Sequence, residues 1–346
     1  MAQVTRDVQQ AAEWLRRGEL VAIPTETVYG LACNGLNEKA VGQIFQAKSR
    51  PSTNPLILHV PHLGAVQGLV RDLPPLARVL MERFWPGPLT LLLDRAPGVP
   101  DAVTAGLPRV AVRMPDHPLT LALLAALDFP LAAPSANRSG YVSPTTAEHV
   151  KAQLGDRITG ILDGGPCAQG LESTVVAVEG GADGRDEVVV YRLGAVPVEA
   201  LRAFLDGLPG SPVLRLHTAV GTAPPSAAAP LAAPGLLSMH YSPLTRLLLV
   251  DAWDDPQLAA QLAALPPGAR VGWLGFTDLP PAARPGAPSR LLSPTGDLGE
   301  AARHLYGALI ALDGTGCDLL VAHRLPPHDL GAVMNERLTR AAARHA

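Results

Sequence analysis

The chain has the sequence LVAIPTETVYGL over residues 20–31. Its first part, Leu20–Pro24, is an apolar run that ends at a proline, and such a run predicts a short buried β-strand. Thr25, Glu26 and Thr27 follow the strand directly. Because ligand sites in open α/β sheets lie at the carboxyl ends of strands, we expect this loop to belong to a site. A threonine-rich turn that caps a helix is the alternative interpretation.

Outward from this loop, apolar runs of strand length alternate with helical patterns through residues 1–206. Asn37 suits the N-cap of one helix, and Pro75 suits the first turn of another. The alternation lacks strict βαβ regularity, so we expect an α/β (α+β-like) domain with a twisted mixed sheet. The expected helices cover residues 5–17, 37–48, 75–84, 117–127, 145–154 and 197–206, and the expected strands cover residues 20–24, 56–60, 89–93, 110–113, 130–133, 174–178 and 187–192.

Residues 207–243 differ in composition from the segments on either side. The stretch Thr222–Gly235 is rich in alanine and proline, which indicates a linker of polyproline-type stiffness. Residues 244–346 predict a small doubly wound, Rossmann-like α/β domain. Neither domain contains a GxGxxG fingerprint or a P-loop. In the second domain, strands are expected near residues 246–250, 270–274 and 318–322, and helices near residues 256–265, 298–312 and 329–343.

Composition restricts the classes of protein to consider. The 346 residues are 47% apolar and 17% charged, with a formal net charge of −3, which fits a globular protein without a general basic field for nucleic acid. No run of about 18 apolar residues predicts a membrane span. The amphipathic N-terminus lacks the apolar core of a signal peptide, so we expect a cytoplasmic protein. Three scattered cysteines predict neither disulfides nor a zinc site, and we expect no protein-held metal.

The stretch Lys48–Leu56 follows an expected helix and carries Lys48, Arg50 and Asn54. The chain has 3 lysines against 25 arginines, so each lysine is conspicuous. A guanidinium and an ammonium together suit the oxygens of a polyphosphate. The alternative is a helix C-terminus with cations that the helix dipole favours. That alternative explains Lys48 and Arg50 but does not explain the polar run as far as Asn54.

Two further polar side chains end expected strands. His59 follows Leu56–Leu58, where a structural core histidine is the alternative. Arg113 lies in the stretch VAVRMP and is suited to clamp a carboxylate with two hydrogen bonds. A charge that protects an edge strand from aggregation is the alternative for Arg113.

The loop Ala132–Gly140 combines small residues with Ser135 and Asn137. Small residues after a strand allow backbone amides to approach an anion or a nucleotide. An ordinary loop is the alternative, and a helix N-terminus explains Ser143 equally well. The remaining polar stretches are residues 171–175, which include Thr174, residues 192–194, which begin with Arg192, and residues 234–243.

In this order, the stretches resemble the YrdC-domain family of threonylcarbamoyl-AMP synthases. The similarity extends over about residues 8–206 and, more loosely, over residues 234–343. The second domain and its linker are typical of the longer, C-terminally extended branch. Each motif alone is a modest signal, whereas the ordered set is specific. The motifs are PTETVYGL, AKSRPSTNPL, FWPGPLTLLL, VAVRMP, AAPSANRSG, ESTV and PGLLSMHYSP.

The resemblance implies a reaction. L-threonine and bicarbonate give a carbamate, whose carboxylate attacks the α-phosphate of ATP and expels pyrophosphate. The product, threonylcarbamoyl-AMP, then serves a separate tRNA threonylcarbamoyl-transferase complex. Catalysis of this type depends on positioning and on neutralising charge at phosphoryl oxygens, with Mg²⁺ held mainly by the phosphates.

The resemblance also implies roles for individual residues. Lys48 and Arg50 are expected to be catalytic, near the carbamate and the phosphates. His240 and Tyr241 are expected to mark a lid, formed by the linker, that excludes water. The residues expected to face threonine are Thr27, His59, Arg113 and Thr174, and those expected to face ATP are Arg50, Asn54, Ser135, Asn137, Ser143 and Arg192.

Some residues depart from the family pattern, and two other functions compete with the synthase reading. Arg109 stands where a hydroxyl residue is common, and Leu237 and Met239 replace more basic residues. A module that binds double-stranded RNA or tRNA predicts a basic face, but residues 1–206 have 18 basic against 21 acidic side chains. A weak tRNA contact through a local patch remains compatible with this balance. A carbamoyl-phosphate-dependent enzyme would carry further domains, and this sequence has no signature of them.

Overall fold

The computed structural model describes residues 1–181, 184–217, 231, 233–234, 241–283 and 285–345. The chain forms two compact units. The first comprises Met1–Ser139 and Pro144–Leu237, and the second comprises Gly140–Ser143 and Ser238–Ala346.

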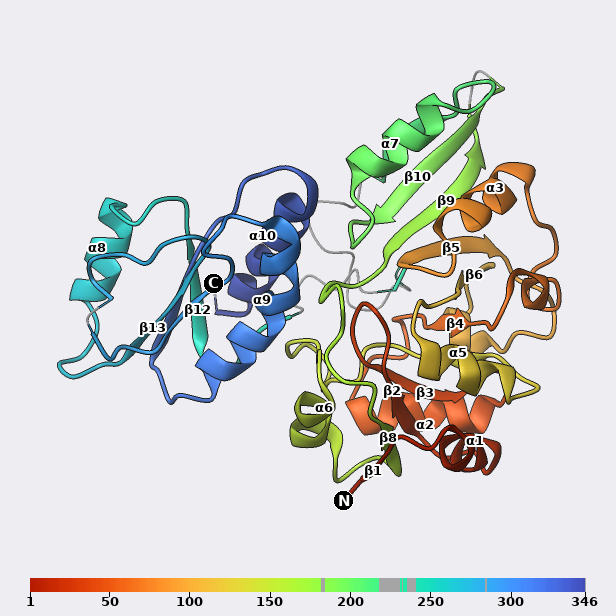
Figure 1. The fold of residues 1–346 in the computed structure, drawn as a ribbon, viewed down its shortest axis with the longest axis horizontal. Helices are drawn as coiled ribbons and strands as arrows, with labels where there is room; N and C mark the ends of the chain where they lie inside the picture. Colours follow the sequence, from red (N-terminus) through yellow and green to blue (C-terminus); the bar gives the residue numbers. More distant parts are fainter. Residues whose placement is uncertain (182–183, 218–230, 232, 235–240, 284, 346) are drawn as a thin grey trace. The chain divides into compact units, whose positions relative to one another are not determined.

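The first unit is built on one mixed sheet in the order β1-β8-β2-β3-β7-β4-β6-β5-β9-β10-β11 (Figure 1). Parallel pairs such as β4 with β6 alternate with antiparallel pairs such as β5 with β6, so the expected mixed α/β sheet is confirmed. Its strands are β1 (Gln3–Thr5), β2 (Val21–Ile23), β3 (Gly30–Asn34), β4 (Ile57–His59), β5 (Leu89–Asp94), β6 (Arg109–Arg113), β7 (Leu131–Ala132), β8 (Gly160–Leu162), β9 (Thr174–Gly180), β10 (Asp186–Arg192) and β11 (Val213–Leu216).

The loop 24–29 joins the antiparallel strands β2 and β3. The Thr25 hydroxyl closes it, because this oxygen accepts hydrogen bonds from the amides of Thr27 and Val28 at 3.2 Å and donates to the Val28 carbonyl at 2.6 Å. Strand β3 was not expected from the sequence. Since a strand follows the loop, the alternative that the threonines cap a helix is wrong.

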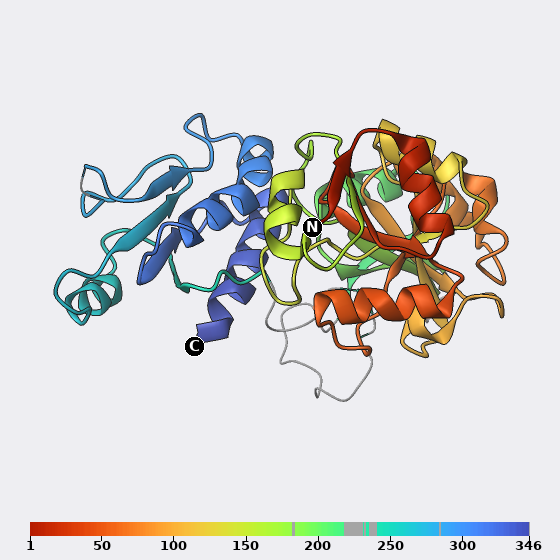
Figure 2. The same ribbon diagram turned by 90° about the horizontal axis from the view of Figure 1, so that it is seen from below.

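Helices cover the two faces of the sheet differently. One face packs against α2, α3, α6 and α7, while α1 and α5 cover part of the other face (Figure 2). The rest of that second face buries Ile57, Ala111 and Val175 under Leu231 and Ala233. The helices of this unit are α1 (Val8–Arg16), α2 (Glu38–Lys48), the 3₁₀ turn η1 (Leu63–Val66), α3 (Pro75–Phe84), α4 (Asp101–Thr104), α5 (Pro118–Ala125), α6 (Ala147–Leu154) and α7 (Val198–Asp206).

Part of the segment assigned to a linker from the sequence has regular structure. Strand β11 lies within residues 207–243 and pairs in parallel with β10. The amide of Leu231 also donates to the carbonyl of Thr53 at 3.0 Å. These contacts attach both places to the first unit.

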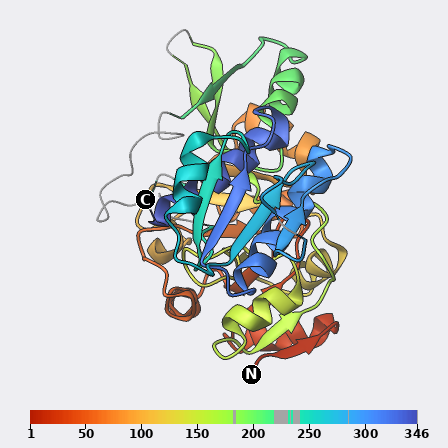
Figure 3. The ribbon, with the colours of Figure 1, turned by 90° about the vertical axis from the view of Figure 1, so that its left-hand side faces the viewer.

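The second unit has a four-stranded, fully parallel sheet in the order β12-β15-β13-β14 (Figure 3). Helix α8 lies on one face, and α9 and α10 lie on the other (Figure 1). This is the doubly wound arrangement that the sequence predicts. The elements are β12 (Arg246–Val250), α8 (Pro256–Ala263), β13 (Val271–Gly275), β14 (Ser289–Leu291), α9 (Leu298–Asp313), β15 (Leu319–His323), α10 (Asp329–Ala342) and the 3₁₀ turn η2 (Ala343–His345).

The short segment Gly140–Ser143 belongs to the second unit, although it interrupts the sequence of the first. The Tyr141 hydroxyl donates to the Asp313 carboxylate at 2.7 Å. The same carboxylate accepts the amides of Leu244 and Thr245 at 3.1 and 2.8 Å. Asp313 therefore ties this segment to the start of β12.

In the described part of the chain, no helix has the length and apolarity needed to cross a membrane.

Gly194 lies where two stretches of main chain touch. A Cβ atom there would clash with backbone atoms of Ser173 and Thr174. We predict that Gly194→Ala lowers the free energy of unfolding by about 1–3 kcal/mol, because main chain cannot move aside as a flexible side chain does. Urea denaturation measures the loss.

Gly180→Ala is the matched control. Gly180 lies in the neighbouring strand β9, and a Cβ atom there would meet nothing within 4 Å. If the two variants unfold at the same urea concentration, the close approach at Gly194 does not limit stability.

Candidate active site

Arg113 is the centre of a buried polar group at the end of β6. Its Nη1 donates to the Thr27 hydroxyl at 2.9 Å, and its Nε donates to the Gly87 carbonyl at 3.2 Å. Its Nη2 lies 2.7 Å from Oε1 of Glu26, and both side chains of this ion pair are 4% exposed. One guanidinium thus connects the loop 24–29 to the turn before β5.

The ion pair between Arg113 and Glu26 leaves hydrogen-bonding capacity unused. Among the described residues, Nη2 and both carboxylate oxygens have no hydrogen-bond partner, although the two charges lie close together. Buried polar atoms in proteins are nearly always hydrogen-bonded, so such a concentration of unsatisfied atoms is typical of a place that binds a polar ligand. Separating the pair would be costly, because it would leave a buried charge uncompensated.

His59 lies beside Arg113. The two residues are register partners in the parallel pair of β4 and β6, so their side chains point to the same face. Burial, reinforced by the Arg113 charge, lowers the pKa of His59 to about 3. The imidazole is therefore neutral near pH 7, and its Nδ1 has no hydrogen-bond partner among the described residues.

Lys48 is the last residue of α2 and is 1% exposed. Its ammonium donates to the carbonyls of Ser135 and Asn137, both at 2.5 Å, and to Oδ1 of Asn137 at 3.1 Å. Burial, and then the nearby Arg50 charge, hold the pKa of Lys48 well below its ordinary value. Lys48 has no carboxylate partner among the described residues, so the positive charge is solvated only by neutral oxygens.

Arg50 and Asn54 form a second buried pair after α2. Ser49 reverses the chain in the left-handed conformation, with φ of 51°. Arg50 Nε then donates to the Asn54 carbonyl at 3.2 Å, and Nη2 donates to the Pro55 carbonyl at 2.9 Å. Two cations, Lys48 and Arg50, therefore lie close together below the protein surface, which is an arrangement that suits an anion.

The loop 135–137 is fixed from within as well as by Lys48. The Ser135 hydroxyl donates to Oδ1 of Asn137 at 2.5 Å, and Asn137 Nδ2 donates to the Arg138 carbonyl at 2.9 Å. Ser135 also forms an isolated bridge with Gly30. The loop that follows β7 is thereby held against the loop that follows β2.

Thr174 and Arg192 lie where β9 and β10 meet. The Thr174 hydroxyl donates to the Val196 carbonyl at 2.6 Å and accepts the Val196 amide at 3.0 Å. Arg192 Nη2 donates to the carbonyl and hydroxyl of Ser173 at 2.8 and 3.0 Å, and Nη1 donates to the Pro234 carbonyl at 3.0 Å. The Thr174 amide donates to the Pro88 carbonyl, next to the Gly87 that Arg113 contacts.

Most of the residues singled out from the sequence are thus linked by short contacts within the first unit. Three are not. Ser143 is buried and belongs to the second unit. Tyr241 also belongs to that unit, where it stacks on Tyr306 at 5.8 Å under the Arg337 guanidinium at 4.7 Å. His240 lies outside the described residues.

The chain matches two family profiles in tandem. Residues 13–194 match the Sua5/YciO/YrdC family, described as telomere recombination, and residues 196–343 match the C-terminal domain of threonylcarbamoyl-AMP synthase. The curated threonylcarbamoyl-AMP synthase of Bacillus subtilis is 40% identical over 97% of this chain and 92% of its own length. That of Pyrococcus abyssi is 37% identical over 97% and 94%.

The chain belongs to the threonylcarbamoyl-AMP synthase family. Among solved structures, Sua5 from P. abyssi in complex with L-threonine superposes with a TM-score of 0.86 at 36% identity, covering 99% of this chain and 98% of that one. The resemblance to the longer, two-domain branch is therefore confirmed.

The structure adds site residues to which the sequence analysis gave no role. Glu26 lies within the motif PTETVYGL and Ser173 within ESTV, so these motifs could have pointed to both residues. His117 and Gln169 come from other segments, and each has a buried polar atom without a partner among the described residues. The backbone amide of Gln169 donates to the backbone carbonyl of Glu26 at 2.7 Å. No spacing in the sequence marks these two residues.

Arg109, one of the departures from the family pattern, lies on β6, the same strand as Arg113, and its guanidinium has partners there. Its Nη1 donates to the Glu179 carboxylate at 2.8 Å and to the Tyr191 hydroxyl at 3.3 Å. Leu237 and Met239 lie outside the described residues. The described residues include no group of three His, Cys, Asp or Glu side chains placed to hold a metal ion.

The low pKa of His59 predicts a pH-dependent stability. Between its ordinary value of 6.5 and about 3, the unfolded chain binds the proton that the folded chain rejects. The free energy of unfolding should therefore fall as the pH falls below 6.5, by at most about 1.4 kcal/mol per pH unit from this residue. His59→Asn should lose that part of the slope in urea unfolding at pH 7 and pH 5.

The exposed His62 supplies the control for this measurement. His62→Asn should keep the slope of the unchanged chain. Identical slopes for His59→Asn and the unchanged chain would contradict the assignment of a buried neutral imidazole.

Proposed function

We propose that this chain makes threonylcarbamoyl-AMP and pyrophosphate from L-threonine, bicarbonate and ATP. In this proposal the reacting groups are bound by residues 1–206, and residues 207–243 join them to a domain formed by residues 244–346. The observation that carries the proposal is the pairing, in one unit of a member of this family, of two different sites. One is the pair of buried cations Lys48 and Arg50, and the other is the polar group around Arg113.

The Arg113 group has the chemistry to hold threonine. A guanidinium donor suits the amino-acid carboxylate, and the Thr27 hydroxyl that it contacts adds a neutral partner. His59 is neutral, so its unpartnered Nδ1 suits a hydrogen bond with the threonine hydroxyl without adding charge. Thr174 is connected to this group because its backbone amide donates to the carbonyl of Pro88, the residue after Gly87. The Thr174 hydroxyl is already bonded to the Val196 backbone.

The Lys48 group has the chemistry to hold ATP. Burial of an ammonium without a carboxylate partner is unfavourable, and a polyphosphate would restore the missing negative charge. Arg50 and Asn54 flank this charge, while Ser135 and Asn137 shape the loop that Lys48 holds. In this proposal Arg192 completes the contacts to the nucleotide.

The reaction needs no nucleophile from the protein. Nitrogen of threonine bonds to the carbon of bicarbonate and water is lost, which gives the carbamate. A carbamate oxygen then bonds to the α-phosphorus while the bond to the departing pyrophosphate breaks. The chain's own contribution is to align these atoms and to stabilise the charge that develops on the phosphoryl oxygens.

Magnesium accompanies ATP in this proposal. The cations near Lys48 suit phosphate oxygens, and the carbonyls and amides beside them do not form a carboxylate cage. Mg²⁺ would therefore be held mainly by the phosphates, where it neutralises their charge.

In this proposal the product passes to a separate tRNA threonylcarbamoyl-transferase complex, and both act in the cytoplasm.

Pyrophosphate release tests the reaction directly. With ATP and Mg²⁺ present, release should require both threonine and bicarbonate, and the nucleotide product should have the mass of threonylcarbamoyl-AMP. Release at the same rate without threonine, or without bicarbonate, would overturn the proposal.

Arg50→Ala should abolish turnover, with a fall in kcat of at least about 100-fold, because it removes one of two buried cations at the phosphates. Arg78→Ala, an exposed change of the same kind in α3, should keep full activity. Far-ultraviolet circular dichroism checks that both variants fold. Near-normal turnover in a folded Arg50→Ala protein would refute the phosphate role.

A further inference from the structure

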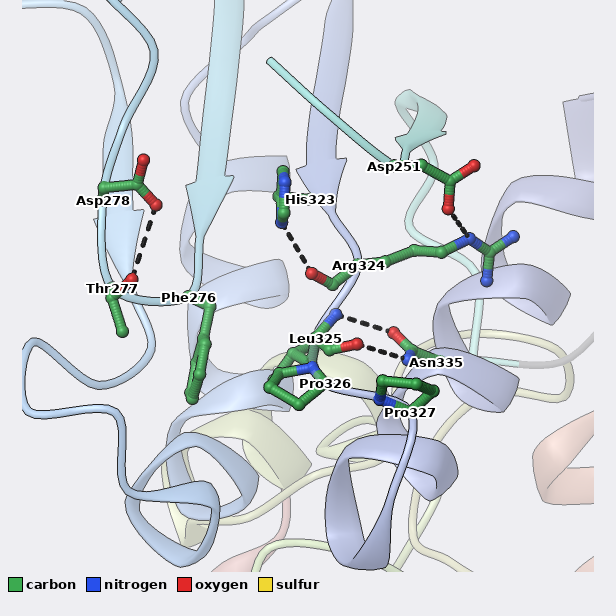
Figure 4. Close-up of a pocket in the computed structure, with 10 residues that line it drawn as sticks. All are labelled: Asp251, Phe276, Thr277, Asp278, His323, Arg324, Leu325, Pro326, Pro327 and Asn335. Atoms are coloured by element: carbon green, nitrogen blue, oxygen red, sulfur yellow. Dashed lines mark hydrogen bonds and ion pairs between the residues drawn. The ribbon is translucent and has the colours of Figure 1, made fainter.

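A cavity of about 440 Å³ lies in the second unit, at the carboxyl ends of β12, β13 and β15 (Figure 4). This volume is within the range of about 300–1,000 Å³ that is usual for small-molecule sites. After β13 the chain continues to β14 at one edge of the sheet, whereas after β15 it continues into α10, which packs on β12. The cavity therefore lies at the topological switch point, where doubly wound folds bind ligands.

The walls of the cavity are held in place by specific residues. Asn335 of α10 donates from Nδ2 to the Leu325 carbonyl at 2.8 Å, and its Oδ1 accepts the Leu325 amide at 2.9 Å (Figure 4). A Cβ atom on Gly331 would clash with the Pro326 carbonyl, and one on Gly275 would clash with the Asp278 carbonyl. Both wall loops thus depend on a close approach that only glycine permits.

The polar atoms that line the cavity are mostly acceptors. The exposed Asp278 carboxylate has one side-chain hydrogen bond, from Thr277 at 3.5 Å. His323 Nδ1 lies 2.6 Å from the Arg324 carbonyl and must donate to it, so this ring nitrogen is already engaged. The main cation, Arg324, is already engaged with Asp251 at 2.9 Å and with Thr339 at 3.2 Å. Such a lining favours a ligand rich in donors.

Phosphate is disfavoured in this cavity. The loop after β12, where phosphate-binding folds place glycines, contains Asp251, Asp254 and Asp255 and no glycine. Asp255 caps α8 by accepting the amide of Gln257 at 2.8 Å. The N-terminus of α8 is therefore already bonded to a carboxylate.

We propose that the cavity binds a nucleoside without phosphate. Asp278 lines the cavity beyond the carboxyl end of β13, and its carboxylate can accept hydrogen bonds from the two hydroxyls of a ribose. Phe276 and Pro326 line the same cavity and offer apolar surface to a base. The proposal is independent of the reaction assigned to residues 1–206.

Calorimetric titration of the full chain with adenosine, guanosine, cytidine and uridine tests the proposal. At least one of them should bind, and Asp278→Asn should weaken that binding roughly tenfold, because a charged hydrogen bond to the diol is lost. Asp254→Asn removes the same charge from an exposed residue outside the lining and should leave the affinity unchanged. Asp278 is exposed, so its variant should fold normally.

Three analogues of the nucleoside that binds separate the sources of affinity. The unchanged chain should bind the 2′,3′-dideoxy form roughly tenfold more weakly than it binds the nucleoside. The Asp278→Asn variant should bind the two compounds equally well. The 5′-monophosphate and a short homopolymer of the same nucleotide should bind more weakly than the nucleoside, because acids flank the cavity. Absence of binding by all four nucleosides, equal binding by Asp278→Asn, or tighter binding of the homopolymer would overturn the proposal.

Discussion

The buried ion pair between Arg113 and Glu26 is the contact on which the candidate site depends. It joins the end of β6 to the loop between β2 and β3, two places 87 residues apart in the chain. The same guanidinium contacts Thr27 and Gly87 and affects the charge state of His59. Because the pair is almost completely buried, any shift of this loop would expose one charge to an apolar surrounding. The site is therefore preorganised by the same contact that stabilises this part of the sheet.

Lys48 likewise holds one loop of the site in place, close to the loop 24–29. Its ammonium holds the 135–137 loop, which in turn bridges to Gly30. The three ammonium hydrogens of Lys48 have three neighbouring acceptors, so the side chain is fixed. A phosphate would therefore meet a rigid positive environment, whose orientation has been set during folding and need not be created on binding.

The sequence predicted the sheet type, the second doubly wound domain and most helices, because these depend on local periodicity. It missed the short strands β1, β3, β8 and β14, and it missed β11, which lies beside a proline-rich stretch. It drew attention to Arg113, Lys48 and His59 through their places at the ends of elements. It assigned no role to Gln169, whose backbone contact with Glu26 arises only from the tertiary fold. Tyr241 packs between Tyr306 and Arg337, and its expected part in a lid stays a prediction.

The cations of the candidate site share one type of partner. Lys48 donates to the carbonyls of Ser135 and Asn137, Arg50 to those of Asn54 and Pro55, and Arg192 to those of Ser173 and Pro234. A main-chain carbonyl is present whatever the side chain is. The identity of each cation is thus restricted by function, while several of the residues that hold it are free to change during evolution as long as the backbone keeps its path. Among related sequences, the cationic side chains of this site should therefore stay the same, while the side chains of the residues whose carbonyls accept from them should vary.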